Sequence, residues 1–390
     1  MKYGIIMHKG TYNLGDDIQS YALAKLLPSV DYVIDRETID TFESENHEPV
    51  AAIMAGWWFW HKWNWPPSDC IVPMLTSMHL NNYTVPQGGT PVDDRWVQGI
   101  GGEYLKAYGP VGVRDESSLE FLQKRGIDAY ISGCVTLTLP KQEPRKDAGT
   151  YVVLADLNPK LNKIARKALE GTGFKIVEVS HRHHYRDPDV SLERRLKKVE
   201  KVLSLYQNAH CVITRRLHVS LPCLAMEVPV LAVVNMKHEG NTTRWSPYKD
   251  LLHCSTNEEF EAGNYTYDFE NPPENKPDYK KYRESILQNV ERFIEETKQC
   301  DKSLEEMRKV TYTNQDVLEW QNELMKWTLD QWFVQGREMT KELNQSQKAV
   351  KKLQKENKLL GGKGGGPEIK KGSSVSEKLK KMLKKKLKKR

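Results

Sequence analysis

Strand-like and helix-like segments alternate along most of the first 234 residues, and this pattern constrains the fold more than any other feature of the chain. Short apolar runs predict strands, and the segments between them repeat their apolar residues with helical spacing. Alternating strands and helices form parallel sheets, whose loops meet in a crevice at the carboxyl ends of the strands. The predicted strands are residues 2–7, 32–34, 50–54, 74–80, 111–114, 129–131, 151–154, 175–179, 211–214 and 230–234, and the predicted helices are residues 17–27, 95–108, 117–125, 161–170, 191–209 and 219–226.

A Pro- and charge-rich stretch at residues 140–147 interrupts the alternation and predicts a linker. Because the pattern then starts again, we expect two domains, residues 1–140 and residues 150–270. We therefore predict an α/β fold in which two Rossmann-like domains face each other across a cleft, a GT-B-like architecture.

Helical patterns return after residue 278. Residues 278–335 predict C-terminal helices, and residues 336–361 predict a short coiled coil that would join two copies of the chain as a homodimer. A lone charged helix is the alternative, because about three heptads are marginal for a coiled coil. The seam residues, with 4-3 spacing and an asparagine at an a-type position, are Met339, Leu343, Ser346, Val350, Leu353, Asn357 and Leu360.

Residues 362–390 predict a Gly-rich hinge followed by a basic amphipathic helix. Residues 367–390 contain 11 Lys or Arg and 2 Asp or Glu, whereas the rest of the chain has 48 basic and 50 acidic residues. One apolar face surrounded by lysines favours in-plane binding to an anionic membrane surface. A disordered polybasic tail and an RNA-binding tail are the alternatives. The nearly neutral remainder argues against nucleic acid as a partner of the folded body.

Composition also bears on the cellular location. Six cysteines are scattered without CxxC spacing, which favours a reducing compartment and argues against a disulfide framework or a zinc site. No apolar run approaches the ~18 residues that a membrane span needs. We expect a cytoplasmic protein that is peripheral at the inner face of the membrane, held there by residues 367–390.

The block Thr214-Arg215-Arg216-Leu217-His218 lies between a predicted strand and a predicted helix. A helix start offers unpaired N–H groups, guanidinium forks suit phosphate or carboxylate, and histidine can donate a hydrogen bond or a proton. We therefore predict an anion site that contains Arg216 and His218. The alternative is an ordinary turn whose arginines pair with surface carboxylates.

Two more cations follow predicted strands. Arg114 ends the strand at residues 111–114, and Lys237 follows the strand at residues 230–234. Both positions lie at the carboxyl edge of a sheet, where ligands bind in open α/β folds. Taken alone, a turn pair with Asp115 would also explain Arg114, and an exposed loop lysine would explain Lys237.

The first loop, residues 8–19, contains Asn13, Gly15 and Asp16. Gly15 lets the backbone approach a ligand, and Asp16 could accept a proton from a hydroxyl group. A plain helix N-cap by aspartate explains the same residues equally well.

Two further segments suggest a sugar ligand. His181 and His183 lie in a loop that we predict to reach a sugar, with a solvated polar loop as the alternative. We predict no metal, because these histidines lack a spaced carboxylate or helical i, i+4 spacing. Residues 57–65 contain five tryptophans, for most of which packing is favoured over stacking on a sugar.

Three blocks of this sequence resemble the polysaccharide pyruvyl transferases: residues 13–16, residues 112–116, and residues 209–218 with the Val-Pro-Val at 228–230. The resemblance extends over residues 1–250. It implies phosphoenolpyruvate as donor, a pyruvate ketal on a sugar of a cell-surface polysaccharide or lipid-linked glycan as product, and no cofactor. The chain departs from the commonest family pattern at two places, residues 55–58 and residues 132–137, which points to a subgroup.

The resemblance also implies roles for single residues. Arg114 and Lys237 would bind the donor together with Arg216, and His218 would act as an acid or contact the phosphate. Asp16 as general base is our own hypothesis. Two rival functions stay open: a nucleotide-sugar glycosyltransferase whose cations hold a diphosphate, and an inactive scaffold that recruits partners through its coiled coil and tail.

Overall fold

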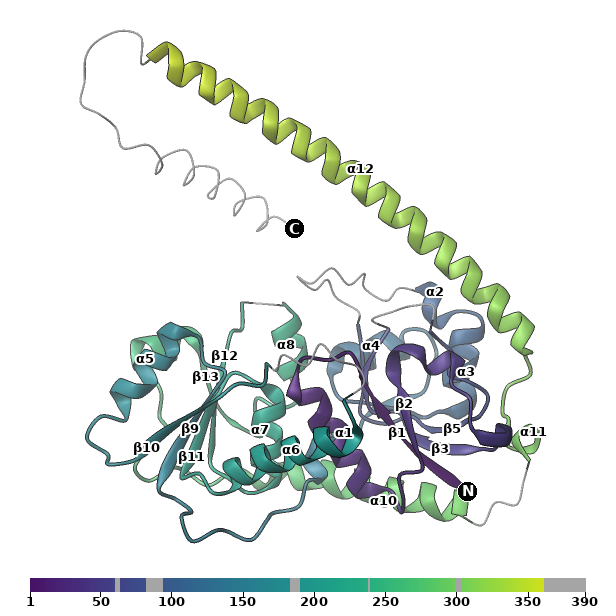
Figure 1. Ribbon diagram of the computed structural model, residues 1–390, viewed down its shortest axis with the longest axis horizontal. Coiled ribbons are helices and arrows are strands. Elements are labelled where there is room, and N and C mark those ends of the chain that lie inside the picture. Colours follow the sequence, from purple (N-terminus) through teal and green to yellow (C-terminus); the bar gives the residue numbers. More distant parts are fainter. Residues whose placement is uncertain (60–63, 82–93, 183–189, 238, 299–302, 361–390) are drawn as a thin grey trace. The chain divides into compact units, whose positions relative to one another are not determined.

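Residues 1–326 form one compact unit, and residues 327–390 form a second. Within the first unit the described strands all pair in parallel, in an N-terminal half and a C-terminal half, which confirms the predicted α/β class with two Rossmann-like halves (Figure 1). The predicted borders at residues 140 and 150 stay predictions. The computed structural model describes residues 1–59, 64–81, 94–182, 190–237, 239–298 and 303–360.

The N-terminal half contains two four-stranded parallel sheets, ordered β2-β1-β3-β5 and β4-β6-β7-β8. Their bounds are β1 Lys2–Met7, β2 Tyr32–Asp35, β3 Val50–Ile53, β4 Gly56–Trp58, β5 Ile71–Met74, β6 Met78–Leu80, β7 Val111–Val113 and β8 Ala129–Ile131. The prediction of one strand at residues 74–80 is wrong. The backbone of Ser77 has a left-handed φ of 53°, and its N–H donates to Ser132 Oγ (3.0 Å), so the extended run is broken between β5 and β6.

The C-terminal half contains one five-stranded parallel sheet, ordered β10-β9-β11-β12-β13. Its bounds are β9 Tyr151–Ala155, β10 Lys175–Val179, β11 Cys211–Thr214, β12 Val230–Val234 and β13 His253–Thr256, and of these only β13 is absent from the strands predicted above. Buried side chains of β9 and β11 pack with those of the flanking helices into one core. The strand order places the loops after β9, β11 and β12 side by side at one edge of the sheet.

Local backbone chemistry explains where several helices begin and end. The bounds are α1 Leu14–Leu26, α2 Asp94–Val97, α3 Ile100–Tyr108, α4 Glu116–Gln123, α5 Pro159–Ala168, α6 Leu192–Gln207, α7 Leu217–Ala225, α8 Glu239–Trp245, α9 Asn257–Ala262, α10 Lys280–Lys298, α11 Leu304–Met307 and α12 Asn314–Leu360. Helix α1 begins three residues before the predicted start, because the Asn13 side chain accepts a hydrogen bond from the Gly15 N–H (3.2 Å). The single helix predicted at residues 95–108 is wrong, since Gly99 interrupts it with a φ of 61°.

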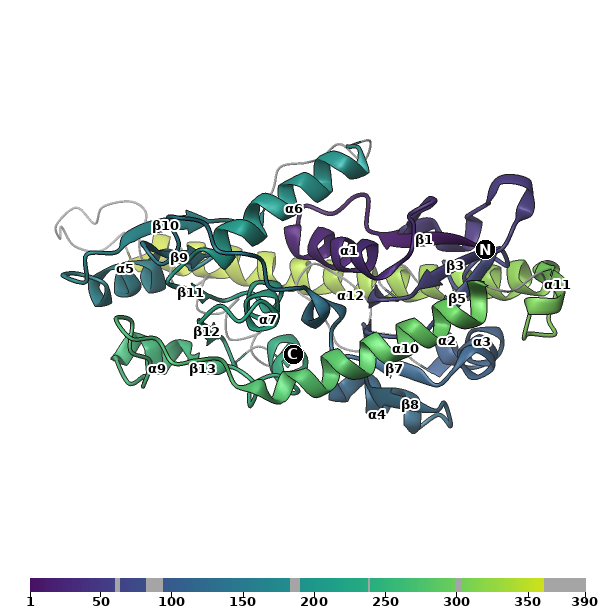
Figure 2. The same cartoon turned by 90° about the horizontal axis from the view of Figure 1, so that it is seen from below.

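Helix α10 spans both halves of the first unit (Figure 2). Its Arg283 donates to the carbonyl groups of Leu139 (3.4 Å) and Ala225 (3.2 Å), and its Asn289 donates to the hydroxyl of Tyr130 (3.2 Å). These bonds tie α7 of the C-terminal half to the end of the N-terminal half. The predicted C-terminal helices are therefore part of the framework that carries the site.

Tryptophan packing accounts for much of the segment after β3. Trp58 and Trp65 are buried and lie edge to face, with ring centroids 5.6 Å apart. The Trp65 indole donates to the Gly101 carbonyl (3.3 Å), and Gln321 of α12 donates to the Trp65 carbonyl (3.3 Å). Packing is confirmed as the role of these two tryptophans; Trp60 and Trp63 lie outside the described residues.

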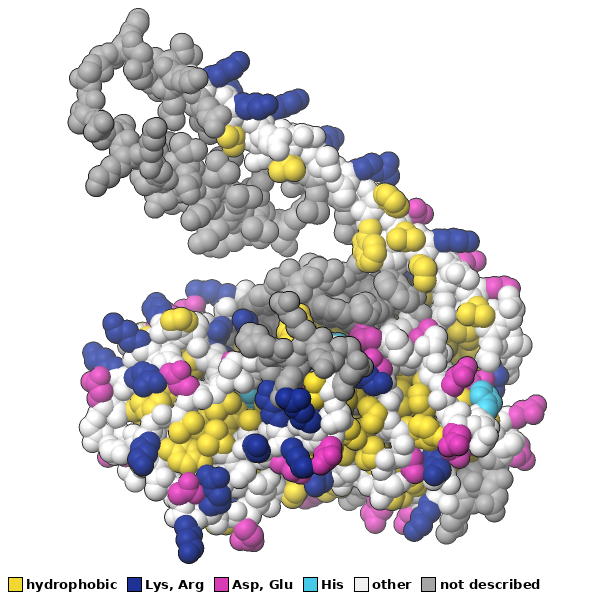
Figure 3. All heavy atoms as spheres, in the orientation of Figure 1, with side chains coloured by type: hydrophobic (Ala, Val, Ile, Leu, Met, Phe, Trp, Pro, Cys, Tyr) yellow, Lys and Arg dark blue, Asp and Glu magenta, His cyan; other side chains and the backbone are white. Residues whose placement is uncertain are grey.

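In the second unit, the helix α12 continues to Leu360, so the predicted helices at residues 316–334 and 336–361 form one element. Apolar side chains gather in its middle and lysines toward its C-terminal end (Figure 3). Leu329, Trp332 and Phe333 are exposed there, as is the seam residue Leu343. The coiled coil stays a prediction, and the predicted basic tail lies outside the described residues. None of the described helices is long and apolar enough to cross a membrane.

A buried ion pair joins the two halves of the first unit. Arg195 on α6 contacts Asp17 on α1 at 3.1 Å, and both side chains are buried. The same guanidinium group donates to the carbonyl groups of His8 (3.4 Å) and Lys9 in the first loop. Burial raises the pKa of Asp17 to about 6, although Arg195 opposes this shift, so most of the carboxyl is ionised at neutral pH.

Arg195→Met should lower the free energy of unfolding by about 3–5 kcal/mol at about pH 7.5, because Asp17 loses its main cation. The loss should shrink toward about pH 5.5. In the variant the pKa of Asp17 is higher still, because its cation is gone, so at pH 5.5 the folded variant binds a proton that the unfolded chain does not. Urea unfolding at both pH values measures this. Lys201→Met, at an exposed position of the same helix, is the control. A loss that is the same at both pH values would contradict the assignment of the loss to the unpaired charge of Asp17.

Candidate functional site

The first loop and the start of α7 lie against each other. Gly15, in the first turn of α1, packs on His218: a Cβ atom at Gly15 would lie 2.9 Å from His218 Nδ1. The N–H of Leu14 donates to the carbonyl of His181 (2.8 Å), next to the Asn13 cap. Four predicted site residues, Asn13, Gly15, His181 and His218, therefore meet although they come from both halves.

Arg114 follows β7 and is 2 % exposed. Its Nη1 donates to Gln19 Oε1 on α1 (2.6 Å), and its carbonyl accepts a hydrogen bond from the hydroxyl of Tyr248 (2.9 Å). Among the described residues the guanidinium donates to Gln19 and not to Asp115, so the turn pair that could explain Arg114 is not formed. The arginine is held from both halves of the unit.

A buried pair, His79 and Asp115, lies beside Arg114. His79 Nδ1 donates to Asp115 Oδ2 (2.5 Å), and Asp115 also caps α4 by accepting from the Ser118 N–H (2.9 Å). Burial lowers the pKa of His79. Burial alone would raise the pKa of Asp115, but His79, Ser118 and Arg114 outweigh it and hold the pKa down. Asp115 is thus an ionised group that helps to offset the charge of Arg114.

His218 is a buried imidazole, 5 % exposed, at the start of α7. Burial, followed by the charges of Arg114 and Arg244, lowers its pKa well below the ordinary value. Its Nε2 lies 3.7 Å from the sulfur of Cys134. At neutral pH His218 is therefore uncharged, and it can donate one hydrogen bond and accept another.

Arg216 ends the loop after β11. Its Nε donates to Asp156 Oδ2 (2.8 Å), and Asp156 also accepts from Ser180 Oγ (2.9 Å) and from the N–H of His181 (3.0 Å). Burial alone would raise the pKa of Asp156, but Arg216 and these hydrogen bonds outweigh it and lower the pKa. Within the described part of the chain, the two terminal nitrogens of Arg216 have no partner. They can bind a further anion.

Asp16 lies in the first turn of α1, next to the first loop. Its Oδ2 accepts from Thr11 Oγ1 (2.5 Å) and lies 3.7 Å from His8 Nδ1. Burial alone would raise the pKa of Asp16, but His8, Arg36 and Thr11 together lower it strongly. Asp16 is therefore ionised and only weakly basic, which is unfavourable for the predicted general base.

The surroundings of the remaining predicted residues differ from one residue to the next. Lys237 is 74 % exposed and forms an ion pair with Glu258 (2.5 Å), unlike the buried Arg114 and His218. His181 is buried, and its Nε2 bonds to the hydroxyl of Tyr206 (2.7 Å). His183 lies outside the described residues.

Four residues of the site escaped the sequence analysis: Gln19, Asp156, Arg244 and Tyr248. Gln19 lies four residues after Gly15, so helical spacing could have placed both on one face of α1. Asp156 is recognised through its bonds to Arg216, Ser180 and His181 within the C-terminal half, and Arg244 and Tyr248 are recognised through contacts with the N-terminal half. Arg244, for example, lies 5.2 Å from the centre of the Trp57 ring, and its charge acts on His218.

The arrangement suits an anionic ligand. Arg114 and Arg216 supply guanidinium donors, and the neutral His218, on which the charge of Arg114 acts, can take up a proton when negative charge arrives. The described residues contain one group able to hold a metal, His47, Asp69 and Cys70, with ligand atoms within 4.8 Å of one another. Cys70 immediately precedes β5, at the amino edge of its sheet, whereas the site residues follow the carboxyl ends of strands.

Comparisons with known proteins identify one family. The sequence model of the polysaccharide pyruvyl transferase family matches residues 13–238, and this range contains every predicted site residue. A comparison with curated proteins gave no match. Among solved structures, the UDP-GlcNAc 2-epimerase of Methanocaldococcus jannaschii, in complex with UDP-GlcNAc and UDP, is 12 % identical, with 78 % of this chain and 94 % of that chain covered and a TM-score of 0.30. A TM-score this low supports no inference about this chain.

Gly15→Ala tests the contact between the first loop and His218. Alanine normally stabilises a helix relative to glycine by about 1 kcal/mol. Here its Cβ would lie 2.9 Å from Nδ1 and 3.0 Å from Cβ of a buried side chain, so we expect a loss of about 1–3 kcal/mol in the free energy of unfolding. Gly10→Ala, whose Cβ would meet His8 at an ordinary 3.8 Å, is the control. A stabilised Gly15→Ala variant, measured by urea unfolding, would refute the contact.

Proposed function

The chain belongs to the polysaccharide pyruvyl transferase family and is a transferase, and on that premise we propose that it transfers a pyruvyl group from phosphoenolpyruvate to two hydroxyls of a sugar. The sugar belongs to a cell-surface polysaccharide or a lipid-linked glycan, and the product is a ketal. One observation supports this choice of donor: Arg114 and His218 are both buried, and the charge of Arg114 contributes to the low pKa that keeps His218 neutral. A donor with both a carboxylate and a phosphate supplies the negative charge that this pair lacks.

The proposed reaction balances without a cofactor. Two sugar oxygens form bonds to C2 of phosphoenolpyruvate, and the bond from C2 to the phosphate oxygen breaks. Of the two hydroxyl protons, one ends on C3, which becomes a methyl group, and the other ends on the released phosphate. The protein therefore has to bind the anionic groups, move protons and stabilise the charge that develops at the leaving phosphate.

The residues fit these tasks in different ways. Arg114 and the free nitrogens of Arg216 bind the carboxylate and phosphate. The negative donor raises the pKa of His218, which then takes up a proton and can pass it to C3 or to the phosphate. Lys237 joins them only if it leaves Glu258. Asp16 stays our proposed base, limited by its low pKa.

The other predicted residues form the walls around the donor. We propose that Asn13 and Gly15 bring backbone close to it, and that His181, oriented by Tyr206, and His183 contact the sugar. His218 also contacts Cys134, which lies in a segment where the chain departs from the commonest family pattern.

Calorimetric titration with phosphoenolpyruvate tests the donor. Arg114→Met should weaken binding about tenfold to a hundredfold, the value of a charged hydrogen bond, whereas Arg166→Met, at an exposed position of α5, should bind as the wild type does.

Donor binding should take up a proton at neutral pH, seen as heats that depend on the buffer, and His218→Asn should abolish this uptake. Binding of UDP-glucose but not phosphoenolpyruvate would favour the glycosyltransferase, and binding of neither would favour the scaffold.

We further propose that residues 367–390 hold the enzyme at the cytoplasmic face of an anionic membrane, and that residues 336–361 pair two chains. The basic, amphipathic sequence supports the first proposal and the 4-3 spacing the second. A soluble enzyme tethered in this way would meet lipid-linked glycans at the membrane surface.

Deletion of residues 367–390 should abolish sedimentation with vesicles that contain anionic lipid, because both the lysines and the apolar face are lost. Unchanged sedimentation would contradict the proposal. A second variant keeps every lysine and changes the apolar face to serine at Leu379, Met382, Leu383 and Leu387. Loss of binding in this variant indicates an amphipathic helix, and retention indicates a polybasic tail.

A further inference from the structure

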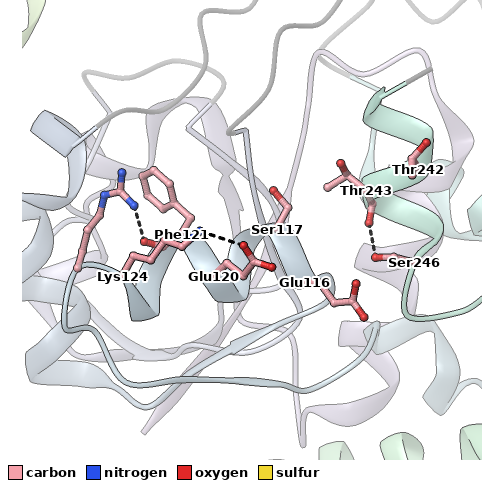
Figure 4. Close-up of a pocket in the computed structure, with 9 residues that line it drawn as sticks. Glu116, Ser117, Glu120, Phe121, Lys124, Thr242, Thr243 and Ser246 are labelled. Carbon is pink, nitrogen blue, oxygen red and sulfur yellow. Dashed lines mark hydrogen bonds and ion pairs between the residues drawn. The ribbon is translucent and has the colours of Figure 1, made fainter. Parts of the chain in front are cut away.

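A cavity of about 510 Å³ lies between α4 of the N-terminal half and α8 of the C-terminal half (Figure 4). We propose that it binds the acceptor sugar, and that the carboxylate of Glu116 accepts a hydrogen bond from one of the sugar's hydroxyls. This inference rests on the proposed transfer and adds the place of the second substrate. Ligand sites in proteins commonly measure about 300–1,000 Å³, so the volume is suitable for a small ligand.

The lining is rich in the groups that recognise a polyol. Hydroxyl groups of Thr242, Thr243 and Ser246 come from α8 and the turn after it, and Glu116 and Ser117 come from the first turn of α4 (Figure 4). Hydroxyls both donate and accept, and a carboxylate accepts two or more hydrogen bonds. A sugar offers a ring of hydroxyls with matching capacity.

The cations of the cavity are already neutralised. Lys124 is paired with Glu120 (3.1 Å), and Arg125 bonds to Asp94 and to the carbonyl of Phe121 (2.7 Å). In contrast, no described residue pairs with the carboxylate of Glu116. The cavity therefore does not suit phosphoenolpyruvate, whose charges need free cations, and it favours a neutral ligand that donates hydrogen bonds.

Each wall of the cavity lies close in the chain to residues that we assign to the donor. Glu116 lies two residues after Arg114 on one side. On the other side Arg244 lies between two lining residues, Thr243 and Ser246, and its charge lowers the pKa of His218. Tyr248 follows on the same side and donates to the Arg114 carbonyl (2.9 Å). A sugar in the cavity would thus lie next to the predicted donor, as attack on C2 requires.

Glu116→Gln and Thr243→Val test the cavity from its two sides. The probes are the methyl glycosides of glucose, galactose, mannose, N-acetylglucosamine and N-acetylmannosamine. Saturation-transfer NMR reports binding of each glycoside, and phosphate release from phosphoenolpyruvate reports transfer. We expect each variant to weaken glycoside binding and to raise KM for the glycoside about tenfold, with KM for phosphoenolpyruvate unchanged. Glu103→Gln, at an exposed position of α3, is the control and should change neither KM.

The outcomes separate this inference from the proposed function. If glycosides bind the wild type and both variants equally, or if the variants raise KM for phosphoenolpyruvate instead, the cavity is not the acceptor site. If no glycoside binds the wild type, the inference is also overturned. If phosphoenolpyruvate is inactive but glycoside binding is lost in both variants, the donor assignment fails and the sugar site stands.

Discussion

The contact between Arg195 and Asp17 is the constraint on which the rest of the site depends. It is a buried ion pair between α6 and α1, and its guanidinium group also holds two carbonyl groups of the first loop. A buried charge without its partner is costly, so the two helices are strongly favoured in one relative position. That position sets Asn13 beside the His181 loop and Gly15 on His218.

The cost of burying charge also explains the protonation states in the site. Within the described ranges, Arg114 is buried with one side-chain hydrogen-bond partner, Gln19, and with the ionised Asp115 nearby. His218 stays neutral because burial, and then the charges of Arg114 and Arg244, lower its pKa. The site is therefore short of negative charge, and an anionic ligand would stabilise it while switching His218 to its protonated form.

Two neighbouring environments of different chemistry follow from this arrangement. Around Arg114 and Arg216, guanidinium donors dominate and favour an anion. Between α4 and α8 the cations are paired and hydroxyl groups dominate, which favours a polyol. The two environments are neighbours in the chain, since α4 begins two residues after Arg114 and α8 carries Arg244. A transferase needs this combination, because a charged donor and an uncharged acceptor must meet without competing for one site.

The sequence by itself determined the local features of this protein. Apolar periodicity located nearly all strands of two parallel halves, and the position of Arg114, Arg216 and His218 after strands placed them at the carboxyl edges where ligands bind. Tertiary structure alone decided which of these residues meet. The bond of Arg114 to Gln19, the ion pair that holds Lys237 on the surface, and the break at Ser77 all involve partners distant in the chain. The neutral state of His218 and the low pKa of Asp16 depend on burial and on neighbouring charges from several segments, and a one-dimensional pattern carries no information about either.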